Sequence, residues 1–286
     1  MRTTTRAVVP AALVGALLLT ACGTENAGTP GASRSPVLRG DAGDLEKDGV
    51  RITGMGGERS EVPVEFEVTN REGQPFTYTV TVDVLSGSGE VLANGKETVA
   101  SVPSGRAVRR TVRIGTMTAG AERARVAKVR RVPADEAPAG AEDCPASGFR
   151  LTADDGDAAM GLRVVGLHLQ NCGDRARRLD GYPLLELLDE GRKPVHGVEV
   201  LRGGGDIAGV TGFDAAPQPV ALEPGESALA RLMWRNTTGA GDAVNAPYVR
   251  VRTGAGARPM TVIPELDLGT TGKLGVSAWT KAPGPR

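Results

Sequence analysis

The sequence predicts an all-β protein with two immunoglobulin-like or β-sandwich domains in tandem, after a signal peptide and a flexible tether. The chain has 40 Gly and 19 Pro among 286 residues, so turns are frequent. In the clearest segments apolar and polar residues alternate with period two, as in half-buried strands. Helical periodicity never persists for two turns in the C-terminal half, and the length suggests about two domains.

The first 21 residues have the organisation of a secretory signal peptide. A short positive segment carries Arg2 and Arg6, and residues 7–19 form an apolar run that includes Pro10. This run is shorter than the roughly 20 apolar residues that a membrane-spanning helix needs. We therefore expect residues 1–21 to direct export and then to be removed.

The end of this leader resembles the lipobox of bacterial lipoproteins. It reads Leu19-Thr20-Ala21-Cys22, an aliphatic residue and two small residues before a cysteine. The resemblance implies that Cys22 receives a diacylglyceryl group and becomes the first mature residue. Such a chain would be lipid-anchored on the extracytoplasmic face of the cell membrane, because two acyl chains suffice for stable anchoring. The alternatives are a plain signal peptide with an incidental cysteine, or an uncleaved anchor.

Residues 22–45 are expected to be a flexible tether that starts at the lipidated cysteine. They are rich in Gly, Ser, Pro and Thr and show no apolar period. As a random coil this segment would span roughly 25–30 Å, so the folded part would lie close to the membrane.

The first folded domain is predicted over residues 46–132 as an immunoglobulin-like sandwich of six or seven strands. Its best strand places Val62, Val64, Phe66 and Val68 on one face. Further strands are expected at 76–85, 91–92, 98–102, 106–114 and 126–132. The series VEFEVTN, YTVTVDVLSGSGEVL and SVPSG weakly resembles FxLYD-like sandwich domains of secreted bacterial proteins, through turn and core residues.

A second β-sandwich is predicted over residues 144–281, after a Pro-, Ala- and acid-rich linker at 133–143 and before a flexible tail at 282–286. Trp234 is expected in its core. The expected strands are 149–153, 161–171, 184–188, 195–201, 220–222, 228–236, 248–253, 260–263 and 275–279.

This second half resembles a domain of unknown function common in secreted lipoproteins of high-GC Gram-positive bacteria. The matching pieces are a strand that ends in Asn171-Cys172, the corner Gly181-Tyr182-Pro183, a Pro224-Gly225 turn and Trp234. The resemblance implies a β-sandwich in the cell envelope and supplies no catalytic residue. Taken without the resemblance, the first three pieces are a turn after Asn171, a corner and a second turn, which specify the fold.

Cys144 and Cys172 are expected to form a disulfide, because thiols outside the cytoplasm oxidise and pair. The closed loop of about 29 residues would add roughly 3–4 kcal/mol of stability. The alternatives are two free thiols or a redox pair, although the C-x-x-C spacing typical of redox sites is absent.

The sequence offers no catalytic constellation, and we expect neither an enzyme nor a cofactor. His168 and His196 are the only histidines, and His168 lies opposite Leu167 and Leu169 on the expected solvated face of a strand. Their spacing gives no support for a metal site. No G-x-S-x-G is present, and the acidic run that starts at Asp154 is read as a surface turn rather than a calcium loop.

Charge excludes nucleic acid as a general partner. Basic and acidic residues number 34 each, and loss of Arg2 and Arg6 with the leader leaves a net charge of −2. Basic residues are concentrated between Arg106 and Arg131. The first interpretation of this run is cross-strand ion pairing. The second reading is a contact for anionic lipid headgroups or an anionic wall polymer. Its candidate residues are Arg106, Arg109, Arg110 and Arg113.

Three functions remain open on the sequence. The first is a non-enzymatic interaction module of the cell envelope that binds an envelope protein or an anionic wall polymer. The second is an architectural spacer without a specific ligand, and the third is a hydrolase. Fold alone does not choose among them.

Overall fold

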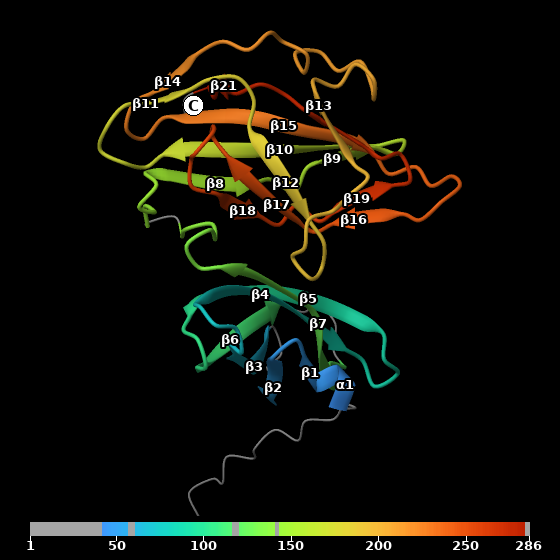
Figure 1. Ribbon diagram of the computed structural model, residues 1–286. Helices are drawn as coiled ribbons and strands as arrows, with labels where there is room; N and C mark the ends of the chain where they lie inside the picture. The colour runs from blue at the N-terminus through green and yellow to red at the C-terminus, as the bar shows by residue number, and fades with distance from the viewer. Residues whose placement is uncertain (1–41, 57–60, 116–119, 141–142, 284–286) are drawn as a thin grey trace, which may run out of the picture. The chain divides into compact units, whose positions relative to one another are not determined.

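The computed structural model describes residues 42–56, 61–115, 120–140 and 143–283, and it is almost entirely β (Figure 1). Within these ranges there is one short helix, α1 (Ala42–Leu45). No helix in these ranges is both long and apolar enough to cross a membrane. The leader, Cys22 and the rest of the predicted tether up to residue 41 fall outside the described residues, and the last four residues of that tether form α1.

The first sandwich packs a four-stranded antiparallel sheet against a three-stranded one. The first sheet has the order β1 (Glu46–Lys47), β2 (Val50–Met55), β3 (Glu61–Thr69) and β6 (Ala107–Gly115). The second has the order β5 (Val91–Val102), β4 (Phe76–Leu85) and β7 (Arg123–Pro133). The two strand segments predicted at 91–92 and 98–102 are one continuous strand, β5.

The core of this sandwich follows the predicted alternation. Val62, Val64, Phe66 and Val68 are all buried, while the residues between them face outward or lie half-buried. They pack against the inward residues of β4 in one hydrophobic cluster. Burial of a Val or Phe side chain stabilises by about 1.5–3 kcal/mol, so this face alone fixes the register of β3.

The second sandwich is built around a sheet with the order β13 (Glu199–Arg202), β20 (Lys273–Val276), β15 (Ser227–Arg235), β10 (Leu162–Asn171) and β8 (Phe149–Ala153). Two short strands extend it, because β21 (Thr280–Lys281) pairs with β15 and β9 (Asp157–Ala159) pairs with β10. All these pairings are antiparallel except that of β13 with β20.

Three smaller sheets complete this half. The largest has the order β12 (Leu184–Leu188), β17 (Tyr248–Arg252) and β18 (Met260–Val262). The other two pair β11 (Arg177–Leu179) with β14 (Val220–Leu222), and β16 (Val244–Ala246) with β19 (Leu266–Gly269). Trp234 is buried in the shared core, as predicted, and its Nε1 donates to the backbone and the carboxylate of Asp267.

Candidate functional site

Cys144 and Cys172 form the predicted disulfide, with their Cα atoms 5.5 Å apart. Cys144 precedes β8 and Cys172 follows the last residue of β10. The Cys172 N–H also donates to the carbonyl of Gly148 at 3.1 Å. The bond therefore ties the start of the second sandwich to the end of one of its central strands.

The four candidate arginines do not form one basic face. Arg109 and Arg113 lie on the outer side of β6, opposite Glu67 and Pro63 of β3, whereas Arg110 lies opposite Phe66 on the inner side. Arg109 donates to Glu67 at 3.1 Å, and Arg51 donates to the same carboxylate at 3.3 Å. Arg106 precedes the strand.

The charge of Arg109 is therefore matched within the sheet. The hydrogen bond from Arg109 lowers the pKa of Glu67 below its ordinary value, with a smaller contribution from Arg51, so Glu67 stays ionised. This arrangement is the cross-strand ion pairing that the alternating charges predict.

His168 is exposed, as predicted, and its partner, Asp154, was not predicted. Its Nε2 lies 3.1 Å from Asp154 Oδ2, while Asp154 Oδ1 accepts the N–H groups of Gly156 and Gly166. Asp154 therefore closes a turn and holds the imidazole at the same time. Among the described residues, no three His, Cys, Asp or Glu side chains converge as a metal site would require, and His196 lies exposed in the loop before β13.

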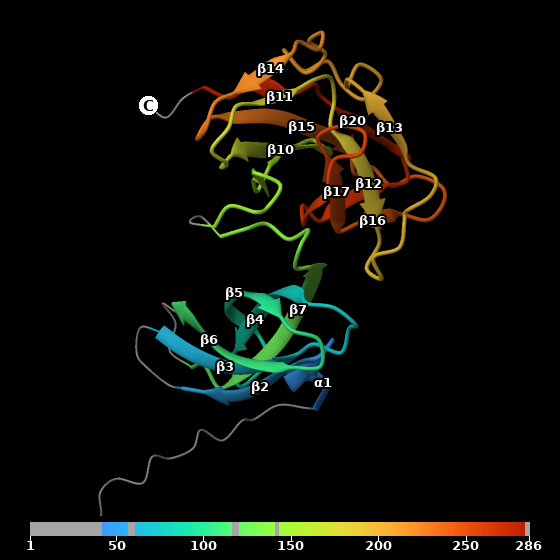
Figure 2. The ribbon, with the colours of Figure 1, turned by 60° about the vertical axis from the view of Figure 1, so that its left-hand side comes forward.

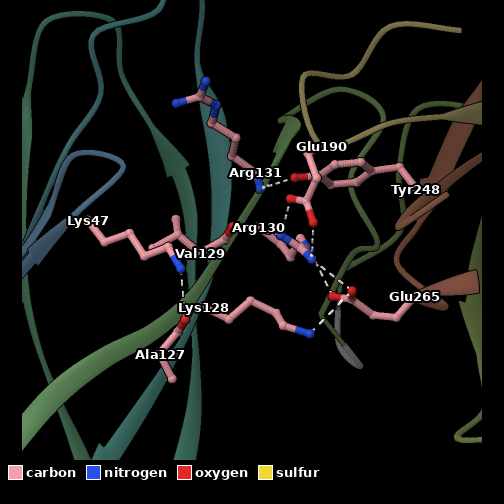
Figure 3. A network of polar contacts seen from close by, with 9 residues as sticks. All are labelled: Lys47, Ala127, Lys128, Val129, Arg130, Arg131, Glu190, Tyr248 and Glu265. Atoms are coloured by element: carbon pink, nitrogen blue, oxygen red, sulfur yellow. Dashed lines mark hydrogen bonds and ion pairs between the residues drawn. The ribbon is translucent and has the colours of Figure 1, made fainter. Parts of the chain in front are cut away.

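Arg130 of β7 binds two glutamates that belong to loops of the second half (Figure 3). Its guanidinium donates to Glu190 at 2.7 and 3.0 Å and to Glu265 through two bonds of 2.8 Å. Lys128 approaches Glu265 at 3.3 Å, and the N–H of Arg131 donates to the hydroxyl of Tyr248 at 3.2 Å. Planar, paired hydrogen bonds of this kind are the strongest that an arginine forms with carboxylates.

The electrostatics of this network favour the ionised pair. Burial opposes ionisation of Glu265, but the hydrogen bond and charge of Arg130, with Lys128, outweigh it and hold the pKa of Glu265 below its ordinary value. Burial also opposes the charge of Arg130, and Glu265 and Glu190 together more than offset it and raise the pKa of Arg130. Both groups are charged at neutral pH.

The linker residue Glu136 makes a second set of contacts. Its carboxylate accepts Arg250 Nε at 2.9 Å and the hydroxyl of Thr261 at 2.7 Å. Its carbonyl accepts the N–H of Thr261 at 2.7 Å. A small hydrophobic cluster of Val132, Leu188 and Tyr248 adds apolar contact. Glu136 therefore binds this part of the linker to the second sandwich.

A surface hollow of about 570 Å³ in the second sandwich is lined by residues of β12 and β13. Figure 2 labels both strands. Four large hydrophobic side chains are exposed in the described part of the chain, and two of them, Leu184 and Val200, line this hollow. Leu184 is 44% exposed and Val200 is 39% exposed. Exposed apolar residues that cluster rather than scatter are typical of binding surfaces.

The corner Gly181-Tyr182-Pro183 shapes one wall of the hollow. Gly181 has a φ of 70°, which glycine adopts without strain, and its carbonyl accepts the N–H of Trp279 at 3.0 Å. Pro183 is buried, which holds the half-buried Tyr182 at the rim. The guanidinium carbon of Arg202 lies 5.7 Å from the centroid of the Tyr182 ring. The hollow is thus apolar at Leu184 and Val200 and cationic at Arg202.

Comparison with known proteins identifies the domain that carries the hollow. No curated protein matches the chain. A β-glucosidase from Kluyveromyces marxianus is 9% identical over 77% of this chain and 45% of its own, with a TM-score of 0.24. A red sea bream transglutaminase is 10% identical over 84% and 32%, with a TM-score of 0.19.

The chain spans less than half the length of both structures, and likenesses this weak carry no argument. A family model matches nearly all of the second sandwich. Residues 144–280 form a DUF4232 domain, a domain of unknown function.

Proposed function

We propose that this chain is a lipoprotein of the cell envelope, anchored through Cys22 on the extracytoplasmic face of the membrane, that acts as a non-enzymatic protein-binding module. The leader and the lipobox-like Leu19-Thr20-Ala21-Cys22 support the anchor. The Cys144–Cys172 disulfide supports an oxidising compartment outside the cytoplasm.

The hollow beside β12 and β13 is the observation that carries the binding role. Leu184 and Val200 each leave more than a third of their surface in water. Covering such side chains yields about 25 cal/mol per Å² of apolar surface, which favours association with a partner. Protein interfaces also favour arginine and tyrosine, and Arg202 and Tyr182 lie on the same rim.

A protein partner is better supported than an anionic polymer. A polymer site at Arg106, Arg109, Arg110 and Arg113 would need these side chains to act together. Arg109 is engaged by Glu67, and Arg110 lies on the other side of the strand. Binding is also favoured over hydrolysis. Among the described residues the His168 side chain hydrogen-bonds to Asp154 alone, so no nucleophile is paired with it.

The architectural spacer remains the second candidate. The contacts that Arg130 makes with Glu190 and Glu265 favour it, because they tie the two sandwiches together. A spacer would need those contacts and would not need the hollow.

Photo-crosslinking in intact cells separates the two candidates. A photoreactive residue is placed at position 184 in the lipidated chain, with position 91 as the matched control, since Val91 is exposed to a similar extent but lies in the first sandwich. The proposal predicts one reproducible protein adduct from position 184 and none from position 91. Equal or absent labelling at the two positions would refute the binding role and favour the spacer.

A further inference from the structure

We infer that the open edge of β13 binds an extended segment of a partner protein by strand addition, with an acidic side chain of that segment placed on Arg202. This inference rests on the proposed binding function and specifies the class of partner. Three features of the structure support it: the direction of the β13 backbone, the apolar side chains of the hollow, and the guanidinium of Arg202, which forms no ion pair with a described residue.

The backbone of β13 presents unused hydrogen-bonding groups. This strand is at the end of its sheet and pairs with β20 alone, with no bulge in the register. The Glu199 N–H points toward β20 and donates to the carbonyl of Gly272, the residue just before that strand, at 2.8 Å. Because backbone groups alternate in direction along a strand, the N–H and C=O of Val200 and Arg202 point away from β20.

The side chains of the same two residues line the hollow. Val200 and Arg202 are two positions apart, so they lie on one face of the sheet, and both border the hollow with Leu184. An added strand would therefore satisfy the outward backbone groups of β13 and lay every second side chain over this surface. Main-chain bonds give such complexes affinity, and the pockets for alternate side chains give them specificity.

Arg202 sets the charge of the partner. Its guanidinium is exposed and lies beside the Tyr182 ring, and no carboxylate of the described residues lies within 4.0 Å of it. Asp180 also lines the hollow but forms no ion pair with Arg202. Stacking on tyrosine orients a guanidinium and leaves its N–H groups available to a carboxylate. The partner segment therefore carries an apolar residue over Val200 and Leu184 and, two positions along the segment, an acidic residue on Arg202.

The edge is short, which bounds the strength of binding. Two residues offer outward backbone groups, so about two main-chain bond pairs form, and we expect dissociation constants in the micromolar range or weaker. Proline offers a selective probe, because it removes a backbone donor and is tolerated on the outer side of an edge strand. Val200→Pro deletes an outward N–H and leaves the Glu199 bond to Gly272 intact.

Strand addition can be tested by selecting peptides from a display library of random nine-residue sequences. The target is the lipidated full chain in detergent micelles. We expect enriched peptides that carry an apolar and an acidic residue two positions apart. Once such a peptide is bound, hydrogen exchange should slow in protein fragments that cover residues 199–203. Val200→Pro should weaken binding at least tenfold, and Arg202→Glu should shift selection to basic peptides. Val91→Ser is the matched control and should bind like the wild type.

The outcomes distinguish this inference from the function on which it rests. Equal binding to the Val200→Pro and wild-type proteins, with both folded by thermal melting, would overturn strand addition, as would the failure of any peptide to enrich over empty micelles. A crosslink that persists at position 184 in either case would leave the binding role standing. A self-associated chain that Val200→Pro dissociates would instead assign the edge to a second copy.

Discussion

Asn70 and Asn171 occupy equivalent corners of the two sandwiches, each fully buried at the end of a strand. Each side-chain oxygen accepts the N–H two residues later, and each amide donates to the carbonyl four residues later. The second donor bond of each amide reaches the strand before a glycine-containing turn, at Val102 and Leu222. The two domains thus share a corner that closes three backbone segments around one amide.

Replacing either asparagine by alanine should destabilise the protein by about 3 kcal/mol, because several buried backbone groups lose their partners at once. Asn70→Ala also removes the acceptor of the Tyr78 hydroxyl. Asn94→Ala is the control, because Asn94 is exposed on β5, and its effect should stay within about 0.5 kcal/mol. Urea unfolding measures all three variants. Losses below about 1 kcal/mol at both corners would show that the shared amide is not what holds them.

Removing the disulfide should lower stability by about 3 kcal/mol through the freedom that the unfolded chain regains. The variant replaces Cys144 and Cys172 together by serine, and reduction of the wild-type protein should give the same loss. Denaturant midpoints compared with and without reductant measure it. If the reduced and oxidised proteins unfold at the same midpoint, the bond adds no stability.

Acid should weaken the Arg130 network through Glu265. The folded-state pKa of Glu265 lies below its ordinary value of 4.5, so its contribution is complete above that value and is lost as pH falls through the folded pKa. Glu265→Gln should lower stability by about 1–2 kcal/mol at pH 7, and this difference should shrink below pH 4. The exposed Glu90→Gln is the control. Thermal melting from pH 7 to pH 3 checks the trend, and a difference that grows in acid would contradict it.

The fold was predictable where alternation was clean and not where glycine or shortness obscured it. Four inward apolar residues at alternate positions predicted the strand at residues 61–69. The strand Val50–Met55 escaped prediction, since its third inward position is Gly54 and a bulge interrupts its register. The strand expected at 195–201 begins later, at Glu199, because Val195 donates to Leu187 and Gly197 has a φ of 82°.

The candidate site was hidden for a different reason. Arg130 meets carboxylates 60 and 135 residues away, and no local pattern encodes such contacts. Leu184 and Val200 come from different sheets, and each looks like an ordinary strand residue. Both side chains are exposed beside the same hollow because of how the two sheets pack, and spacing along the sequence does not predict that packing. The disulfide was predictable because only two cysteines remained after Cys22.

Lipid anchoring is tested by mass spectrometry of the mature N-terminus, on protein purified from the membrane fraction. We expect the mature chain to begin at Cys22 and this residue to carry a diacylglyceryl group. The variant Cys22→Ala should lack the modification and leave the membrane fraction, while the protein with serine at positions 144 and 172 should remain there. An unmodified mature chain that begins elsewhere, or membrane retention of Cys22→Ala, would contradict lipid anchoring at this residue.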